Sequence, residues 1–218
     1  MTKTGAAAGP AYDDRAESAM DWAKEKARPI GIAVLVVAVA LIGWMLFRQY
    51  QNRRADAADA ALNRARQSYS QGNLPLAQTD LRRVISGFSG SSAGSQATML
   101  LAQAYYEQGK ADSGLKVLAD GKPVGTDRAA FEALKGAGLE QKKEYAQAAE
   151  RYRAAADLAD AKIAKERYMA DAARALTSAG NKSEAAKIWS SLATDNASTF
   201  SNEARVRLGE LTATPASK

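Results

Sequence analysis

"LAQAYYEQGKADSGLKVLADG", residues 101–121, decides the fold. It has small and apolar residues at helical spacing, then Gly109, then a second run of the same kind. Three other stretches align with it: "RARQSYSQGNLPLAQTDLRRVI" (64–85), "LKGAGLEQKKEYAQAAERYRAAA" (134–156) and "DAARALTSAGNKSEAAKIWSSLA" (171–193). Each stretch therefore predicts a helix, a turn and a second helix.

Five positions recur in all four stretches. A small residue is followed by an apolar, aromatic or small polar residue, a turn residue, a second small residue and a large residue. In chain order these are Ala65, Ser68, Gly72, Ala77 and Leu81; Ala102, Tyr105, Gly109, Gly114 and Leu118; Gly136, Leu139, Lys143, Ala148 and Tyr152; Ala173, Leu176, Gly180, Ala185 and Trp189. The second small residues lie 37, 34 and 37 residues apart. This period and pattern are those of the tetratricopeptide (TPR) repeat.

The pattern has a physical explanation. Small residues let the two helices of a pair approach closely, a glycine ends the first helix in a left-handed turn, and the large residue fills the space against the next pair. One pair cannot bury its apolar face alone, so several pairs must stack. The sequence therefore predicts an all-α protein whose residues 49–213 form an α-solenoid of about four TPR-like helix pairs.

The connections and the end of the chain are also predictable. Residues 86–96 are rich in glycine and serine and predict a long loop between the first and second pairs. Residues 120–128 join the second and third pairs, with Thr126 or Asp127 as the expected N-cap. Residues 196–213 predict one more helix that covers the last repeat, and residues 214–218 a frayed tail.

The N-terminal quarter carries a different pattern. Residues 30–47 are uncharged and mostly apolar, and as a helix they would extend about 27 Å, close to the hydrocarbon thickness of a bilayer. A cleaved signal peptide is not expected, because a long segment of mixed charge precedes the run and the bulky "WMLFRQY" ends it. Residues 29–48 are therefore predicted to be a transmembrane helix that anchors the chain, with Gly43 and Trp44 making anchor contacts.

Two segments precede the predicted anchor. Residues 1–12 are expected to be disordered, and residues 13–28 to form an amphipathic helix with acidic residues first and basic residues last. Four Lys or Arg residues lie in the fifteen positions before the run and three in the fifteen after it. This small difference favours a cytoplasmic N-terminus and an exported C-terminal domain.

Composition argues against most kinds of chemistry. The chain of 218 residues has no Cys and no His, so a thiol nucleophile, the commonest general base and the commonest transition-metal ligand are missing. Phosphate-binding loops and nucleophile-elbow motifs do not occur. The net charge of +6 is spread thinly, and Arg and Lys alternate with Asp and Glu along 150–168. We expect no enzyme, cofactor, metal, nucleic-acid partner or small-molecule substrate.

The chain also resembles the bacterial YfgM family. The similarity covers roughly residues 15–213 and rests on Trp22, Gly31, the triplet Ile42, Gly43 and Trp44, then Tyr50 and the alanines Ala55, Ala58 and Ala61. The resemblance implies an inner-membrane protein with a cytoplasmic N-terminus and a periplasmic TPR domain. It also implies an ancillary partner of the SecYEG translocon that links it to periplasmic chaperones or exported clients.

Two kinds of function remain open. A membrane-tethered TPR adaptor would bind partner proteins in the concave face that the first helices line. Alternatively, the chain is a structural or assembly subunit of another membrane complex, bound through residues 30–47. The repeat periodicity gives candidate concave-face residues, of which the two tyrosines are the strongest: Arg66, Tyr69, Gln103, Tyr106, Glu140, Arg174 and Thr177.

Overall fold

The computed structural model describes residues 13–213, and the side chains of residues 13–31 and of Val34 lie outside that description. The disorder predicted for 1–12 and the tail predicted for 214–218 fall outside the described residues. The chain divides into two compact units, Met1–Arg54 and Ala55–Lys218. Each unit is considered separately below.

Within residues 13–213 the structure has nine α-helices and no strand. They are α1 (Asp13–Ser70), α2 (Leu74–Gly87), α3 (Ser92–Glu107), α4 (Ala111–Asp120), α5 (Asp127–Gln141), α6 (Tyr145–Leu158), α7 (Lys162–Ser178), α8 (Lys182–Thr194) and α9 (Ser201–Thr212).

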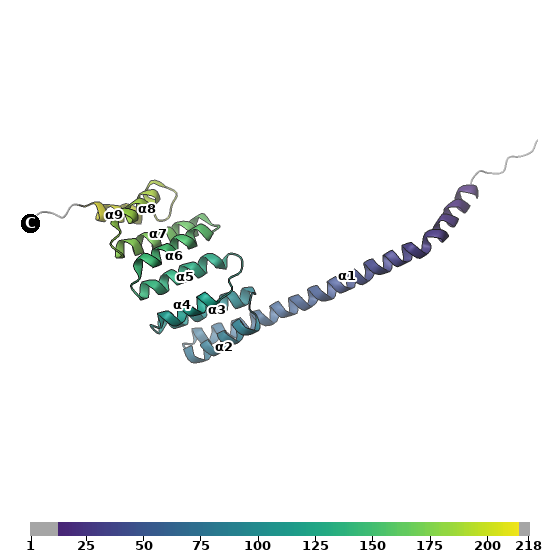
Figure 1. Ribbon diagram of the computed structural model, residues 1–218, viewed down its shortest axis with the longest axis horizontal. Coiled ribbons are helices and arrows are strands. Elements are labelled where there is room, and N and C mark those ends of the chain that lie inside the picture. Colours follow the sequence, from purple (N-terminus) through teal and green to yellow (C-terminus); the bar gives the residue numbers. More distant parts are fainter. Residues whose placement is uncertain (1–12, 214–218) are drawn as a thin grey trace, which may run out of the picture. The chain divides into compact units, whose positions relative to one another are not determined.

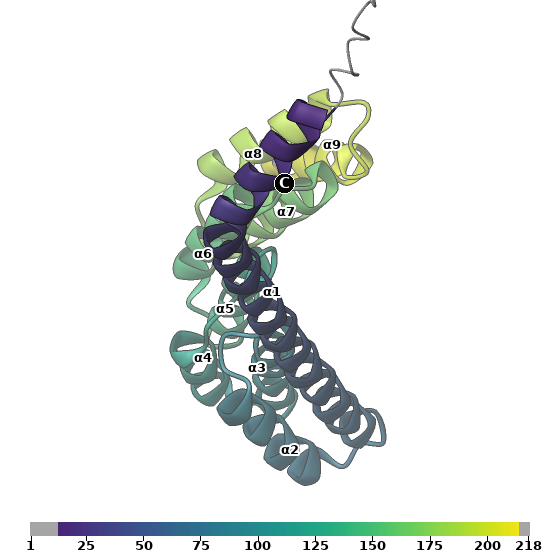
Figure 2. The same ribbon diagram turned by 90° about the vertical axis from the view of Figure 1, so that its right-hand side faces the viewer.

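The second unit is the predicted solenoid. The end of α1 pairs with α2, and the following pairs are α3 with α4, α5 with α6 and α7 with α8, each joined by a short turn. Figure 1 shows α2 to α9 following one another along a single stack. In Figure 2 the second helices α4, α6 and α8 lie along one side of the first helices α3, α5 and α7. The prediction of an all-helical TPR-like solenoid is confirmed.

The recurring positions form the core of the solenoid. At the four recurring positions other than the turn, all sixteen residues of the four repeats are buried, from Ala65 in the first to Trp189 in the fourth. Where the small residue is glycine, the partner is a tyrosine ring: a Cβ on Gly136 would lie 2.8 Å from Cε1 of Tyr152. The sequence period therefore reports contacts between the two helices of a pair.

The four turns within the pairs share one backbone motif. Gly72, Gly109 and Gly180 have φ values of 75°, 69° and 81°, and Lys143 takes the same place with φ 60°. In each turn the next residue donates its N–H to the carbonyl of the residue five positions earlier, at 2.9–3.1 Å. This is the Schellman bond, which satisfies a carbonyl at the end of the first helix.

The loops between pairs differ from the prediction. The expected loop over 86–96 is only 88–91, because α3 already begins at Ser92. The hydroxyl of Ser91 caps α3 by accepting the N–H of Gly94 at 3.1 Å, so a Gly/Ser-rich stretch starts a helix. Thr126 stands at the N-cap position of α5 as expected, although its side chain makes no capping bond.

The C-terminal helix α9 covers the last repeat, as predicted. Ala204 is fully buried in the cluster that contains Trp189, and Phe200, Leu208 and Leu211 pack against the same cluster. The connection before α9 is held by Glu166, a buried carboxylate that accepts the hydroxyl of Ser198 at 2.8 Å.

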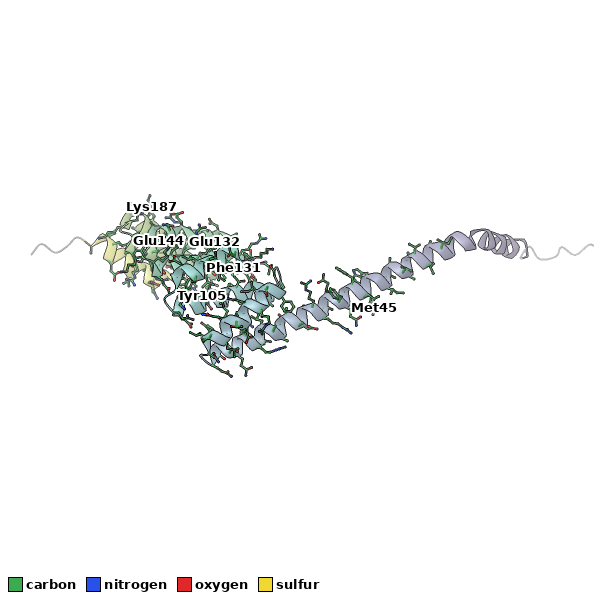
Figure 3. The ribbon with its side chains drawn as sticks, turned by 60° about the horizontal axis from the view of Figure 1, so that its bottom comes forward. Met45, Tyr105, Phe131, Glu132, Glu144 and Lys187 are labelled. Carbon is green, nitrogen blue, oxygen red and sulfur yellow. The ribbon has the colours of Figure 1, made fainter. Side chains whose placement is uncertain are left out.

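The first unit contains the α1 residues up to Arg54. From Leu35 to Arg54 every side chain is exposed, including large apolar ones such as Met45, which stands out from the helix in Figure 3. Among the described residues, no helix combines the length and the apolar character that a membrane span requires. The transmembrane helix predicted for 29–48 includes residues 29–31 and Val34, whose side chains lie outside the description.

Candidate protein-binding groove

The first helices of all four pairs line one groove of about 630 Å³. Its middle is apolar and small, while both ends carry polar and charged side chains. The lining residues are Arg66 and Tyr69 of α1; Gln96, Met99, Leu100 and Gln103 of α3; Asp127, Ala130, Ala133, Leu134 and Ala137 of α5; Tyr152 of α6; and Arg167, Tyr168 and Asp171 of α7.

Three of the predicted surface residues lie together in this groove. Arg66 donates from its guanidinium to the side-chain oxygen of Gln96, and Gln103 is exposed on the same helix as Gln96. The hydroxyl of Tyr69 donates to the carboxylate of Glu107. Partial burial and this carboxylate raise the pKa of Tyr69 to about 12, so its hydroxyl stays protonated and keeps donating at neutral pH.

Tyr106 is not a surface residue, so the expectation of an exposed tyrosine there is wrong. Only 8% of the side chain is exposed, and the ring lies against Gly114 of α4 and Gly138 of α5. A Cβ on Gly138 would come within 2.4 Å of its hydroxyl oxygen. Repeat position alone could not show this, because the space for the ring is created by glycines that lie 8 and 32 residues further along the chain.

The other three predicted residues lie outside the groove lining. Glu140 is half-buried and accepts the hydroxyl of Tyr152 at 2.8 Å. The guanidinium of Arg174 makes a bidentate ion pair with Glu203 of α9, at 2.9 and 2.6 Å. Thr177 is exposed, but its hydroxyl donates to the carbonyl of Ala173 at 2.8 Å. Glu140 and Arg174 thus serve contacts within the repeat domain.

A polar network runs from the groove to the capping helix. Asp171 lines the groove and accepts from Arg174 at 2.5 Å, and Arg174 also stacks over the indole of Trp189 at 5.9 Å. Burial raises the pKa of Asp171 against the opposing effect of Arg174, whereas the bond from Arg174 lowers the pKa of Glu203. The network ties α9 to the C-terminal end of the groove.

Sequence reasoning missed most of the groove on α5 and α7. In three first helices the residue after the small packing position was chosen, namely Arg66, Gln103 and Arg174, whereas in α5 only Glu140 was chosen and Ala137 was not. The lining moves to earlier turns of the first helices along the stack. A seven-residue step back keeps the same helical face. From Gln103, Ala137 and Arg174 that step leads to Gln96, Ala130 and Arg167, all of which line the groove. The step would have identified three of the missed residues.

The two predicted anchor residues lie in the first unit. A Cβ on Gly43 would meet no other atom within 4 Å, and Trp44 is largely exposed. The guanidinium of Arg48 lies over the Trp44 ring, 5.3 Å from its centre. An aromatic ring beside a cation at the end of an apolar run is typical of a membrane interface, but membrane contact itself remains a prediction.

Comparison with protein families gives one match. A model described as a tetratricopeptide repeat-like domain matches residues 56–169, more than half of the chain. The chain belongs to the tetratricopeptide repeat-like family. The match ends at residue 169, within α7, so it covers only the beginning of the fourth helix pair, α7 and α8. Domains of this kind are scaffolds for protein–protein interaction, and they use the concave surface of the stack.

Solved structures support the fold. Two crystal structures of nearly identical TPR-like repeats, from a Podosopora anserina protein assigned as a kinesin light chain, align with TM-scores of 0.57 and 0.56. One of the two is a variant with a single substitution. Each has 15% sequence identity and covers 70% of this chain and 84% of the other. Comparison with curated protein sequences finds no match.

Proposed function

We propose that this protein is a membrane-tethered TPR adaptor that holds segments of partner proteins in its groove. The groove is the observation that carries the proposal, because it is continuous over the first helices of all four pairs. Its volume lies within the usual range for binding clefts, and exposed polar groups such as Gln103 lie beside an apolar centre.

The tether is proposed from the N-terminal unit. Between Leu35 and Phe47 no side chain is charged, and large apolar side chains are exposed on every side of α1. Large contiguous apolar surfaces of this kind need a partner, either lipid or protein. Lipid is the simpler partner, because the full run of residues 30–47 has the length of a bilayer's hydrocarbon layer.

The location is proposed from the family resemblance. The triplet Ile42, Gly43 and Trp44 and the alanines that follow it resemble YfgM proteins, which supports a bacterial inner-membrane protein with a cytoplasmic N-terminus and periplasmic repeats. On this basis the partners are translocon subunits, periplasmic chaperones or exported chains. Protease treatment of spheroplasts should digest the repeats, while carbonate extraction should leave the full chain in the membrane.

Photocrosslinking in intact cells tests the adaptor function. A photoreactive residue in place of Gln103 probes the groove, and one in place of Trp44 probes the anchor. Lys187 serves as the control, because it is exposed on α8, the second helix of the fourth pair, and does not line the groove (Figure 3). Adducts with translocon subunits or exported chains through Gln103, and none through Lys187, are the expected result.

The same experiment addresses the structural-subunit alternative. The exposed apolar surface around Trp44 could also contact another membrane protein. If Trp44 alone captured one complex unrelated to export, and Gln103 captured nothing, the chain would be a structural subunit and not an adaptor.

A further inference from the structure

The charges that line the groove are not equally compensated. Of its two acidic side chains, Asp171 is paired with Arg174. Asp127 is the first residue of α5, where the helix dipole favours a negative charge, and its buried Oδ2 has no hydrogen-bond partner among the described residues. Within residues 13–213, neither Arg66 nor Arg167 has a carboxylate at ion-pair distance. Among the described residues, Arg66 and Arg167 are therefore the two lining cations that no ion pair occupies, although Arg167 is close enough to Asp171 to oppose the rise that burial causes in the pKa of that carboxylate.

The two arginines stand at opposite ends of the groove. Arg66 belongs to the first pair and Arg167 to the fourth. Arg66 is oriented by Gln96, whose own amide donates to the hydroxyl of Ser92 at 3.0 Å. Because Gln96 is neutral, it directs the guanidinium without cancelling its charge. An arginine that is already oriented loses less side-chain entropy on binding, so it binds a carboxylate better than a free surface arginine does.

The lining between the arginines is mostly apolar, with Gln96, Gln103 and Asp127 as its polar members. Ala130, Ala133 and Ala137 place three methyl groups on the groove side of α5, and Leu134 and Met99 lie beside them. Small residues there leave room for side chains of a partner. Tyr69 and Tyr168 stand with the arginines at the two ends and combine apolar rings with hydroxyl groups. The lining thus has a mostly apolar middle and one arginine at each end.

We infer that the groove selects an extended protein segment with aliphatic residues in its middle and carboxylates at both ends. Three steps between neighbouring first helices, at roughly 8–10 Å each, separate α1 from α7. An extended chain of about eight residues covers that distance. Arg66 binds the carboxylate at one end, Arg167 binds the carboxylate at the other, and the aliphatic side chains lie over the alanines.

Peptide binding to the full chain in a mild non-ionic detergent tests this specificity. The probe is a fluorescein-labelled octapeptide with alanine and leucine in the middle and two glutamates at each end. Matched probes carry glutamine or lysine in place of glutamate. Fluorescence anisotropy should show the glutamate peptide binding at least about tenfold more tightly than the glutamine peptide, with affinity falling as salt rises.

Substitutions identify the two arginines. Arg66→Gln and Arg167→Gln should each weaken binding of the glutamate peptide by about tenfold and leave the glutamine peptide unaffected. Lys116→Gln removes an exposed cation on α4, outside the groove lining, and should change neither. Both arginines are exposed, so unchanged circular dichroism should confirm that the variants fold.

The inference rests on the proposed function, and the outcomes separate the two. Equal binding of the glutamate and glutamine peptides, tighter binding of the lysine peptide, or insensitivity to both arginine substitutions would overturn the specificity. So would crosslinks from Gln103 to a second copy of this chain. If Gln103 captures an export partner in cells while the glutamate peptide shows no preference, the adaptor function survives and only the charge selection is wrong.

Discussion

The joint between the second and third helix pairs is closed differently from the joint between the third and fourth. In the first, the Tyr106 ring enters a space that exists because Gly114 and Gly138 lack side chains, and Phe131 lies against Gly121 in the same way. In the second, alanines of α6 and α7 share one buried cluster, among them Ala149, Ala170 and Ala172, all with no exposed surface.

The packing contacts are distributed differently over the side chains of the two joints. An aromatic ring in a glycine pocket concentrates the contact in a few atoms, so removing the ring or adding one methyl group changes the whole joint. An alanine interface spreads the contact over many small side chains, and no single one dominates. We therefore expect the second–third joint to be the more sensitive to point substitutions.

Removing the ring should have the largest effect. Tyr106→Ala deletes a buried aromatic side chain and leaves a cavity, which should lower the free energy of unfolding by about 3–5 kcal/mol. Tyr168→Ala, at a half-exposed position, is the control and should cost clearly less. Urea denaturation followed by circular dichroism measures both. Equal losses of unfolding free energy in the two variants would show that packing in the glycine pocket adds no stability beyond that of a half-exposed tyrosine.

Filling the pocket should have the next largest effect. The Cβ of Gly138→Ala would lie 2.4 Å from the Tyr106 hydroxyl oxygen, so we expect a loss of about 1–3 kcal/mol despite the better helix propensity of alanine. Gly209→Ala in α9 meets no atom within 4 Å and should stabilise by up to about 1 kcal/mol.

A double variant sharpens this test. If the clash with the hydroxyl is the cause, Tyr106→Phe should restore part of the stability that Gly138→Ala removes. The two substitutions would then be coupled, and a double-mutant cycle should give an interaction free energy of about 1 kcal/mol. Additive effects would mean that the methyl group is accommodated elsewhere.

Removing the hydroxyl group should affect stability differently at Tyr106 and Tyr152, although both rings pack against glycines. The Tyr106 hydroxyl is buried and has no hydrogen-bond partner among the described residues, whereas that of Tyr152 donates to Glu140 at 2.8 Å. We expect Tyr106→Phe to be neutral or stabilising by about 1 kcal/mol, and Tyr152→Phe to cost about 1–2 kcal/mol. Thermal melts of the two variants are enough to distinguish these signs.

The stability of the fourth pair should depend on pH through the ion pair between Arg174 and Glu203 of the capping helix α9. Arg174 lowers the pKa of Glu203, so this carboxylate stabilises the fold above its unfolded pKa of about 4.3, and the contribution is lost as pH falls through the lower folded value. Asp171 and Glu140 have raised pKa values and act in the opposite direction, favouring the folded state as pH falls.

Glu203→Gln isolates that contribution. Relative to the parent chain, the variant should lose up to about 1 kcal/mol at pH 7, because both partners are about one-third exposed, and the difference should shrink towards pH 3. A difference that grew on acidification would contradict the ion-pair assignment. Denaturation at several pH values measures it.

The turn of the third pair should show the smallest effect. Lys143 is the one non-glycine residue with positive φ in residues 13–213, and its counterpart in the second pair is Gly109. Lys143→Gly removes the steric cost of that conformation but adds chain entropy to the unfolded state, so we expect a net gain of about 0.5 kcal/mol. Gly109→Lys should have the opposite sign. A loss of stability in the first variant, measured by thermal melts, would mean that the turn is not strained.

The sequence was informative wherever one residue type met a local requirement. Small residues at fixed spacing predicted the paired helices, and Gly72, Gly109 and Gly180 marked the turns because few other residues adopt positive φ. Even Lys143 was identified, through register and not through its own preference. The short loop at 88–91 was missed because serine and glycine are common both in loops and at helix starts.

The groove was less predictable because it depends on relations between repeats. Arg66, Tyr69 and Gln103 were found from periodicity, but the lining shifts along successive first helices, so Tyr168 and Asp171 were not. Tyr106 and Tyr69 occupy the same position in their repeats. What distinguishes them is Gly114, where the first repeat has Ala77, together with Gly138. Gly138 is a residue of the next pair, so no pattern within one repeat contains its contribution.

The capping helix α9 also decides how long the solenoid can be. Stacked repeats have no intrinsic length, because the face that ends one pair is suited to accept another. By covering the cluster around Trp189 with Ala204 and its neighbours, α9 removes the surface on which a second molecule could add head to tail. Without it, the apolar cluster around Trp189 would be exposed at the end of the stack, and an exposed apolar patch of this kind favours association with other molecules.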